Sequence, residues 1–242
     1  MSLPTQAVIL AGGLGTRLLP HTKNLPKPMI DINGMPFLSH IFEYLKNNGI
    51  YKVLLLTGYK SNKIVDYYGN GKQAGLEIDY SIGETDWKTG KRLKYAQDKL
   101  DDNFLMLYCD NYCPINLNKL YEFHKESPDG ATVAVYNNLD SSTKNNVFVS
   151  PQGLVLEYDK SRKSKNLNGV EIGYFILAKK FIENLPEGNY PFEKKLLPYL
   201  IRKNRLRAFT TNHKYYSIGS IERLPETKRF LSDRKILFLD RD

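Results

Sequence analysis

The chain has 242 residues and a formal net charge of +9, and 41% of its residues are hydrophobic. This is the composition of a globular protein with enough apolar side chains for a core, and no run of about 18 apolar residues could span a membrane. Two cysteines, Cys109 and Cys113, are too few for a disulfide scaffold, so we expect a reduced, cytoplasmic protein. The positive charge predicts an anionic partner. Because no nucleic-acid motif accompanies it, phosphorylated metabolites are favoured over nucleic acid.

Apolar runs and helical patterns alternate along the first 137 residues. The run QAVILAGG is typical of a buried parallel strand, and PFLSHIFEYLKNNG has helical spacing with Pro36 at its start and Gly49 at its end. The expected strands span residues 6–13, 51–58, 76–82, 103–111 and 131–137, and the expected helices span 36–49, 61–69 with Ser61 as its cap, 90–100 and 116–126. This alternation predicts a mainly parallel sheet with ligands at the carboxyl ends of its strands.

The pattern is less regular after about residue 140. Short strand-like pieces surround a basic loop, and two helical stretches follow. These pieces span 146–150, 154–158 and 173–178, and the helical stretches are Phe192–Lys203 and Ile221–Leu231. Because no linker or repeat interrupts the chain, we expect one domain over residues 1–232, with a separate segment beginning at 233–242.

The stretch LAGGLGTRLLPHTKNLPKP is a glycine-rich turn after the first strand, and it fits neither G-x-G-x-x-G nor a P-loop. Backbone N–H groups in such a turn can bind phosphate oxygens, and small residues let the phosphate approach. Arg17 adds a planar fork for charged oxygens. Lys27 lies between two prolines, which predicts a stiff, extended segment that aims it at a second charge. Two cations on one loop predict more than one phosphate.

The stretch from Leu10 to Ile50 resembles the signature of the sugar-1-phosphate nucleotidyltransferases, and the resemblance continues to about residue 230. It implies a three-layer α/β/α fold with a mixed, mainly parallel, Rossmann-like sheet. It also implies that an NTP and a sugar 1-phosphate give an NDP-sugar and pyrophosphate, with Mg²⁺. Arg17 would support the departing pyrophosphate, and Lys27 would contact phosphates at the reacting centre. The residues implied to hold the nucleotide here are Leu10, Ala11, Gly12, Gly13, Gly15 and Thr16.

Two further motifs concern the metal. The resemblance makes Asp110 of YCDNYC the Mg²⁺ carboxylate, with Cys109 where the family has glycine. Relatives often carry a second Mg²⁺ aspartate where this chain has Ser217, and a hydroxyl is a far weaker magnesium ligand. Three interpretations follow: Asp110 and the phosphates suffice, metal binding is weaker, or the chain is catalytically degenerate.

The sugar-binding part is implied by two later stretches. LEYDKS resembles the family's E-K-P element, which would bring Asp159 and Lys160 to the sugar phosphate. GVEIGYFIL resembles the strand that follows, so Glu171 would face sugar hydroxyls and Gly173 would give room.

The base-recognition stretch DWKTGKRLKYA looks more like the T-G-G-R-L-K of glucose-1-phosphate cytidylyltransferases than the G-T-x-G-A of many relatives. Gly90 would let the backbone approach the base, whereas Arg92 and Lys94 have no assigned role. The base therefore stays open.

The last eight residues, KILFLDRD, resemble the first motif of haloacid-dehalogenase-like phosphatases, with Asp240 and Asp242 at D-x-D spacing. This predicts the start of a fused phosphatase domain, without phosphatase activity in this chain; a strand that pairs with the main sheet is the alternative. Such a partner would suit heptose 1-phosphate with GTP as substrates, in nucleotide-sugar and polysaccharide synthesis. The alternatives are a glucose-1-phosphate cytidylyltransferase and a catalytically degenerate nucleotide-sugar-binding domain. We expect no nucleic-acid or membrane partner, and a homo-oligomer remains open.

Overall fold

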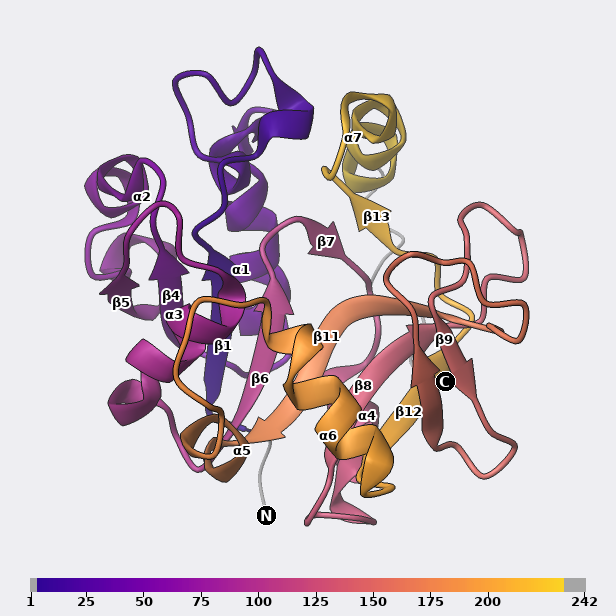
Figure 1. Ribbon diagram of the computed structural model, residues 1–242. Coiled ribbons are helices and arrows are strands. Elements are labelled where there is room, and N and C mark those ends of the chain that lie inside the picture. The colour runs from indigo at the N-terminus through magenta and orange to yellow at the C-terminus, as the bar shows by residue number, and fades with distance from the viewer. Residues whose placement is uncertain (1–3, 233–242) are drawn as a thin grey trace.

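The computed structural model describes residues 4–232, and a seven-stranded sheet forms its centre (Figure 1). Across the sheet the order is β12 (Leu206–Thr211), β8 (Ala131–Tyr136), β11 (Val170–Ala178), β6 (Asn103–Tyr108), β1 (Gln6–Ala11), β4 (Lys52–Thr57) and β5 (Glu77–Ile82). Only β11 runs antiparallel to the other strands of this sheet. The expected mixed, mainly parallel sheet is therefore confirmed.

The central strand β1 shows why the sheet needs helices on both sides. Its side chains alternate between two buried clusters, with Ala7, Ile9 and Ala11 in one and Val8 and Leu10 in the other. Because successive side chains of a strand point to opposite faces, a strand that is apolar throughout has to be covered twice.

Helices cover both faces and complete the three layers. One cluster receives apolar side chains from α1 (Phe37–Asn47), α2 (Ser61–Tyr68), α4 (Leu117–Lys125) and α7 (Leu224–Ser232). The other receives them from α3 (Thr89–Tyr95), α5 (Lys179–Glu183) and α6 (Leu196–Arg202), and α6 crosses in front of the sheet in Figure 1. The three-layer α/β/α fold is confirmed.

Short antiparallel strand pairs lie outside the central sheet. They are β2 (Asp31–Ile32) with β3 (Met35–Pro36), β7 (Asn111–Tyr112) with β13 (Tyr216–Ser217), and β9 (Val147–Val149) with β10 (Val155–Tyr158). The β7–β13 pair matters most for the site, because it brings a segment near the end of the chain to the carboxyl end of β6.

Local structure differs from the expectations at several places. Edge strand β12 and helix α5 were not predicted. The expected helix over 90–100 is α3 followed by a separate 3-10 turn, Gln97–Lys99. Ser61 is not the cap of α2 but its first residue; Lys60 precedes it with a left-handed backbone, and no side chain caps this helix.

Two expectations concern the ends and the membrane. The tail with Asp240 and Asp242 lies outside the described residues. Within residues 4–232, every helix is too short or too polar to cross a bilayer.

Candidate functional site

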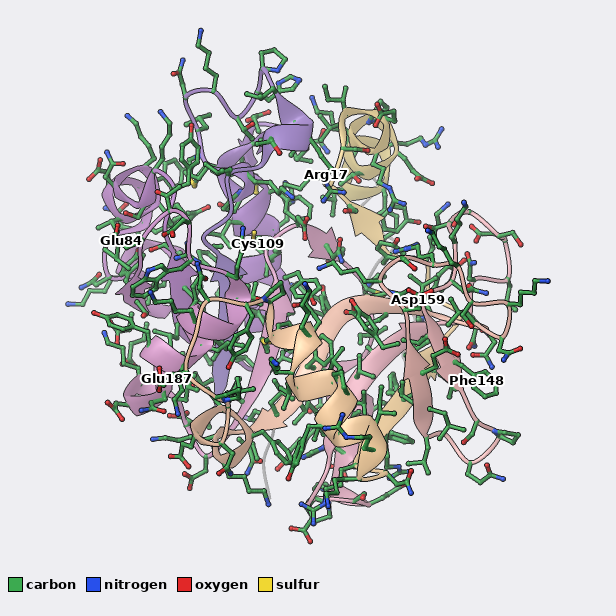
Figure 2. All side chains as sticks on the ribbon, in the orientation of Figure 1. Arg17, Glu84, Cys109, Phe148, Asp159 and Glu187 are labelled. Atoms are coloured by element: carbon green, nitrogen blue, oxygen red, sulfur yellow. The ribbon has the colours of Figure 1, made fainter. Side chains whose placement is uncertain are left out.

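A cleft of about 750 Å³ lies at the carboxyl ends of β1 and β6. In Figure 2, Glu84, Cys109 and Asp159 lie across the middle of the view, from the β5 side to the β9 side. Basic side chains outnumber carboxylates in the lining, so the cleft favours anionic ligands. The basic residues are Arg17, Lys27, Lys88, Arg92, Lys160, Arg162 and Arg223, and the acidic residues are Asp110, Glu171 and Glu193.

The glycine-rich loop forms one wall. Gly15 has φ +66°, a left-handed conformation that glycine adopts without strain, and a Cβ there would lie 2.9 Å from the Thr22 side chain. The Thr22 hydroxyl donates to the Gly15 carbonyl at 3.0 Å, which folds the loop back on itself. Arg17 lies in the 3-10 turn that follows (Thr16–Leu18), exposed at the cleft.

Lys27 and Asp110 meet across the cleft. Lys27 Nζ lies 2.8 Å from Asp110 Oδ2, and their side chains are 14% and 19% exposed. The expected extended segment is only partly correct, because Pro26 is extended but Lys27 begins a 3-10 turn with Pro28 at its second position. Asp110 therefore neutralises the lysine that the loop presents.

Ser217 lies directly beside Asp110, because β13 pairs Ser217 with Asn111. The Ser217 hydroxyl donates to the main-chain carbonyl of Asp110 at 3.0 Å and accepts from the Gly219 N–H at 3.0 Å. Arg17 reaches the same place: a Cβ at Gly219 would lie 3.9 Å from both Arg17 Nη2 and Asp110 Oδ2. The hydroxyl therefore ties the end of β13 to the backbone of Asp110.

Glu171, near the start of β11, lines another part of the cleft. It is 8% exposed, and this burial raises the pKa of its carboxyl from 4.5 to about 8. Its side chain accepts a hydrogen bond from the Gly173 N–H. Gly173 has φ +85°, and a Cβ there would lie 2.4 Å from the Tyr108 ring, so glycine lets β11 pass over that ring. Gly173 itself does not line the cleft.

Glu193 is a site residue that the sequence did not reveal. It is 7% exposed and accepts from Lys160 Nζ at 3.1 Å, from the Tyr108 hydroxyl at 3.3 Å and from the Thr89 hydroxyl at 3.3 Å. The carboxylate therefore joins the loop after β10 to the end of β6 and the start of α3. In the sequence, its surrounding stretch FEKK indicates only the charged start of a helix.

Two arginines of the cleft were missed in a similar way. Arg162 and Arg223 both donate to the Thr143 hydroxyl, at 3.1 and 3.3 Å. Arg223 also donates to the Tyr215 hydroxyl. They hold the loop before β9 against the cleft, and Arg162 comes from a cluster, KSRKSK, that looks like a solvated surface in the sequence.

Four predicted contact residues do not line the cleft: Thr16, Gly90, Asp159 and Gly173. The carboxylate of Asp159 accepts from the backbone of Ser161, Lys163 and Ser164, and a hydrogen bond from the Ser161 side chain holds the pKa of this carboxyl well below its usual range. The Asp159 carboxylate therefore stabilises the turn in which it lies. The other ten predicted residues, from Leu10 to Glu171, line the cleft together. The ligand contacts of all fourteen stay predictions.

Gly90 has a packing reason to be glycine. Its N–H donates to the Tyr190 carbonyl, and a Cβ would lie 2.7 Å from that oxygen.

The comparisons with known proteins agree with this architecture. The family described as nucleotidyl transferase matches residues 6–234. D-glycero-alpha-D-manno-heptose 1-phosphate guanylyltransferase of Aneurinibacillus thermoaerophilus is 32% identical over 88% of this chain and 93% of its own. The Bacillus subtilis protein named "Probable glucose-1-phosphate cytidylyltransferase" is 30% identical over 93% of this chain and 95% of its own. The crystal structure of HddC from Yersinia pseudotuberculosis complexed with GMP-PN is 27% identical, with a TM-score of 0.78 over 93% of this chain and 99% of that chain.

Proposed function

Since the chain belongs to the nucleotidyl transferase family and is a sugar-1-phosphate nucleotidyltransferase, we propose that it works with Mg²⁺ at Asp110 and that its substrates are GTP and heptose 1-phosphate. The proposed site rests on one observation: Arg17, Lys27 and Asp110 line the same cleft beside the glycine-rich loop.

The reaction needs no nucleophile from the protein. A phosphate oxygen of the sugar 1-phosphate, already deprotonated, forms a bond to the α-phosphorus of the NTP. The bond from that phosphorus to the bridging oxygen breaks, and pyrophosphate leaves with the electron pair. The protein therefore has to align the two phosphates and neutralise their charge.

The residues of the cleft divide this work by position. The glycine-rich loop offers backbone N–H groups to the NTP phosphates, and Arg17 stabilises charge that develops on the pyrophosphate. Lys27 leaves Asp110 and contacts the phosphates at the reacting centre. Lys160 exchanges Glu193 for the sugar phosphate, and Glu171 faces the sugar.

The donor set at Asp110 suits Mg²⁺. Nowhere in residues 4–232 do three His, Cys, Asp or Glu side chains gather as metal ligands, so an ion here would take most of its ligands from phosphates and water. Mg²⁺ accepts such an arrangement because it keeps several waters and binds through one or two carboxylates. When bound, it would neutralise phosphate charge during the displacement. Ser217 contributes by fixing the backbone of Asp110.

GTP and heptose 1-phosphate are supported by the guanylyltransferase relatives and by HddC, which was crystallised with GMP-PN. CTP with glucose 1-phosphate is the second candidate. It is supported by the Bacillus subtilis relative and by the stretch TGKRLK.

A pyrophosphate-release screen tests these assignments. Purified protein with Mg²⁺ is mixed with each of the four NTPs and with heptose, glucose and mannose 1-phosphates, and Arg17→Ala serves as a control for contaminating enzymes. Fastest release with GTP and heptose 1-phosphate supports the proposal, whereas a preference for CTP and glucose 1-phosphate replaces it with the second candidate. No release with any pair would favour the degenerate interpretation of Ser217.

A cytoplasmic location, a homo-oligomeric state, a role in polysaccharide synthesis and a fused phosphatase domain stay predictions. A fused domain would appear as a reading frame that continues past Asp242 with further phosphatase motifs.

A further inference from the structure

Arg92 carries a buried charge that is held by main-chain carbonyls, and Asp86 favours this charge only from beyond salt-bridge distance. The residue lies on α3 and is 4% exposed. Its guanidinium donates to four main-chain carbonyls: Thr57 at 2.5 Å, Glu84 at 2.6 Å, Gly12 at 3.1 Å and Trp87 at 3.2 Å. In the described part of the chain no carboxylate lies within 4.0 Å of it. Burying a cation costs free energy unless its hydrogen bonds are satisfied, so these carbonyls are what stabilises it there.

Three glycines make the space that the guanidinium fills. A Cβ at Gly12 would lie 2.3 Å from Arg92 Cζ, one at Gly58 would lie 2.4 Å from Nη2, and one at Gly83 would lie 3.1 Å from Nη1. None of the three has a left-handed backbone, so room for the guanidinium is the reason for glycine at Gly12 and Gly58. At Gly83 the Trp87 ring, 2.4 Å from such a Cβ, is the closer neighbour.

The four carbonyls belong to segments on opposite sides of the nucleotide end of the cleft. Gly12 belongs to the glycine-rich loop, and Trp87 belongs to the segment between β5 and α3. Both line the cleft. Thr57 ends β4, which lies between β1 and β5 in the sheet. The Tyr59 N–H donates to the Gly12 carbonyl at 3.4 Å and the Gly83 N–H to the Thr57 carbonyl at 3.0 Å, so backbone hydrogen bonds link neighbouring segments. The Arg92 guanidinium adds one planar group that joins all three segments at once. A lysine could not do the same, because it places its donors on a single nitrogen rather than on a rigid fork.

We propose that Arg92 is a positioning residue that sets the spacing between the glycine-rich loop and the β5–α3 segment, and through it the affinity for the NTP. It acts through the loops and not through the reacting atoms. The inference rests on the proposed place of the NTP at the glycine-rich loop, but it does not depend on which base is used.

Trp87 makes the inference measurable, because it is the one tryptophan of the sequence, it lines the cleft and its carbonyl is one of the four acceptors. Quenching of its fluorescence by each NTP gives a dissociation constant without turnover. Two variants disturb the contact in different ways. Arg92→Lys keeps the charge and removes the fork, and Gly58→Ala keeps Arg92 but occupies the space of its guanidinium.

Both variants should raise the dissociation constant for the NTP by about 10-fold or more. This is the effect expected when the glycine-rich loop or the β5–α3 segment shifts by up to about 1 Å. The KM for the sugar 1-phosphate should stay within about twofold, since Lys160 and Glu193 do not contact Arg92. The double variant should bind NTP no more weakly than the more severely affected single variant, because both substitutions disturb the same contact. Lys94→Met is the matched control: it removes a cation from the same helix, and Lys94 contacts the Glu183 carbonyl instead, so NTP binding should be unchanged.

The outcomes distinguish the proposed nucleotide site from the proposed role of Arg92. If the parent protein itself binds no NTP, the proposed nucleotide site fails. If the parent binds NTP and both variants bind it as tightly as the parent, the positioning role of Arg92 is wrong. The role is also wrong if the dissociation constant for the NTP and the KM for the sugar 1-phosphate rise by the same factor. Should Arg92→Lys not fold, Gly58→Ala decides, since it retains the charge and every hydrogen-bonding group.

Discussion

The buried carboxyl of Glu171 makes folding stability depend on pH in a direction opposite to that of most acidic residues. Burial raises the pKa of this carboxyl from 4.5 to about 8, and the nearby Glu193 adds to the effect. The folded protein therefore binds this proton more tightly than the unfolded chain does. The stabilisation is fully present below pH 4.5, and it is lost as the pH rises through 8.

The magnitude follows from the two pKa values. Each pKa unit between the folded and unfolded protein corresponds to about 1.4 kcal/mol, so moving from pH 4.5 to pH 8 withdraws at most about 4 kcal/mol of folding free energy. Relaxation of the cleft and entry of water reduce this loss. We therefore expect about 2–4 kcal/mol, which is a large part of the stability of a typical domain.

Glu171→Gln measures this loss, because the amide keeps an oxygen for the Gly173 N–H and cannot ionise. Free energies of unfolding from urea titrations at pH 5 and pH 8 are compared between parent and variant. At pH 5 the two should agree within about 1 kcal/mol. At pH 8 the variant should be the more stable by about 2–4 kcal/mol.

Glu187→Gln, which changes an exposed carboxylate, is the control and should show no pH-dependent difference from the parent. A difference between parent and Glu171→Gln that is equal at both pH values would refute the reasoning, because it would mean that Glu171 is ionised throughout.

Three further predictions concern the reaction. Arg17→Ala should lower kcat by about 10²–10³-fold with a much smaller change in the KM for the sugar 1-phosphate, because Arg17 acts on charge that develops in the transition state; a near-parental kcat in steady-state kinetics would remove it from the site. Asp110→Asn should cut activity and raise the Mg²⁺ concentration for half-maximal rate, and an unchanged Mg²⁺ titration would contradict the metal assignment. Ser217→Asp should lower that Mg²⁺ concentration if the new carboxylate can face the metal, at the cost of the hydrogen bonds that Ser217 makes to Asp110 and Gly219; no shift in the titration would show that this position does not face the ion.

The fold could be predicted where local pattern and tertiary role coincide. β1 and β4 are short apolar runs that end in glycine, and both are central strands of the sheet. β12 was missed because Arg207 interrupts it and its neighbours are basic. Arg207 packs its guanidinium over the Phe123 ring and pairs with Glu126, which makes an arginine compatible with an edge strand. That compensation comes from α4 and is invisible in the strand itself.

The site could be predicted in part for a similar reason. Arg17 and Asp110 each follow a parallel strand, and topology alone sends such residues to one edge of the sheet. Glu193 could not be found this way, because its importance lies in contacts with residues 33 to 104 positions away along the chain. Arg92 was visible as an unexplained arginine, but only the three-dimensional structure shows that its partners are main-chain carbonyls, which leave no trace in the sequence.

Lys27 and Lys160, the cleft lysines that are proposed to contact phosphates, differ in how easily they can reach one. Lys160 is 69% exposed, and when it leaves Glu193 that carboxylate keeps the hydroxyls of Tyr108 and Thr89 as partners. Lys27 and Asp110 are both largely buried, so Lys27 cannot leave without depriving a largely buried carboxylate of its ion-pair partner. A cation that arrives at Asp110 with the NTP removes this obstacle, because it takes the place of the lysine just as a phosphate becomes available to it. Binding of the NTP and of Mg²⁺ should therefore favour each other, and dissociation constants for the NTP at several Mg²⁺ concentrations measure this coupling. In Asp110→Asn, which lacks both the metal carboxylate and the partner of Lys27, the dependence on Mg²⁺ should be weaker than in the parent.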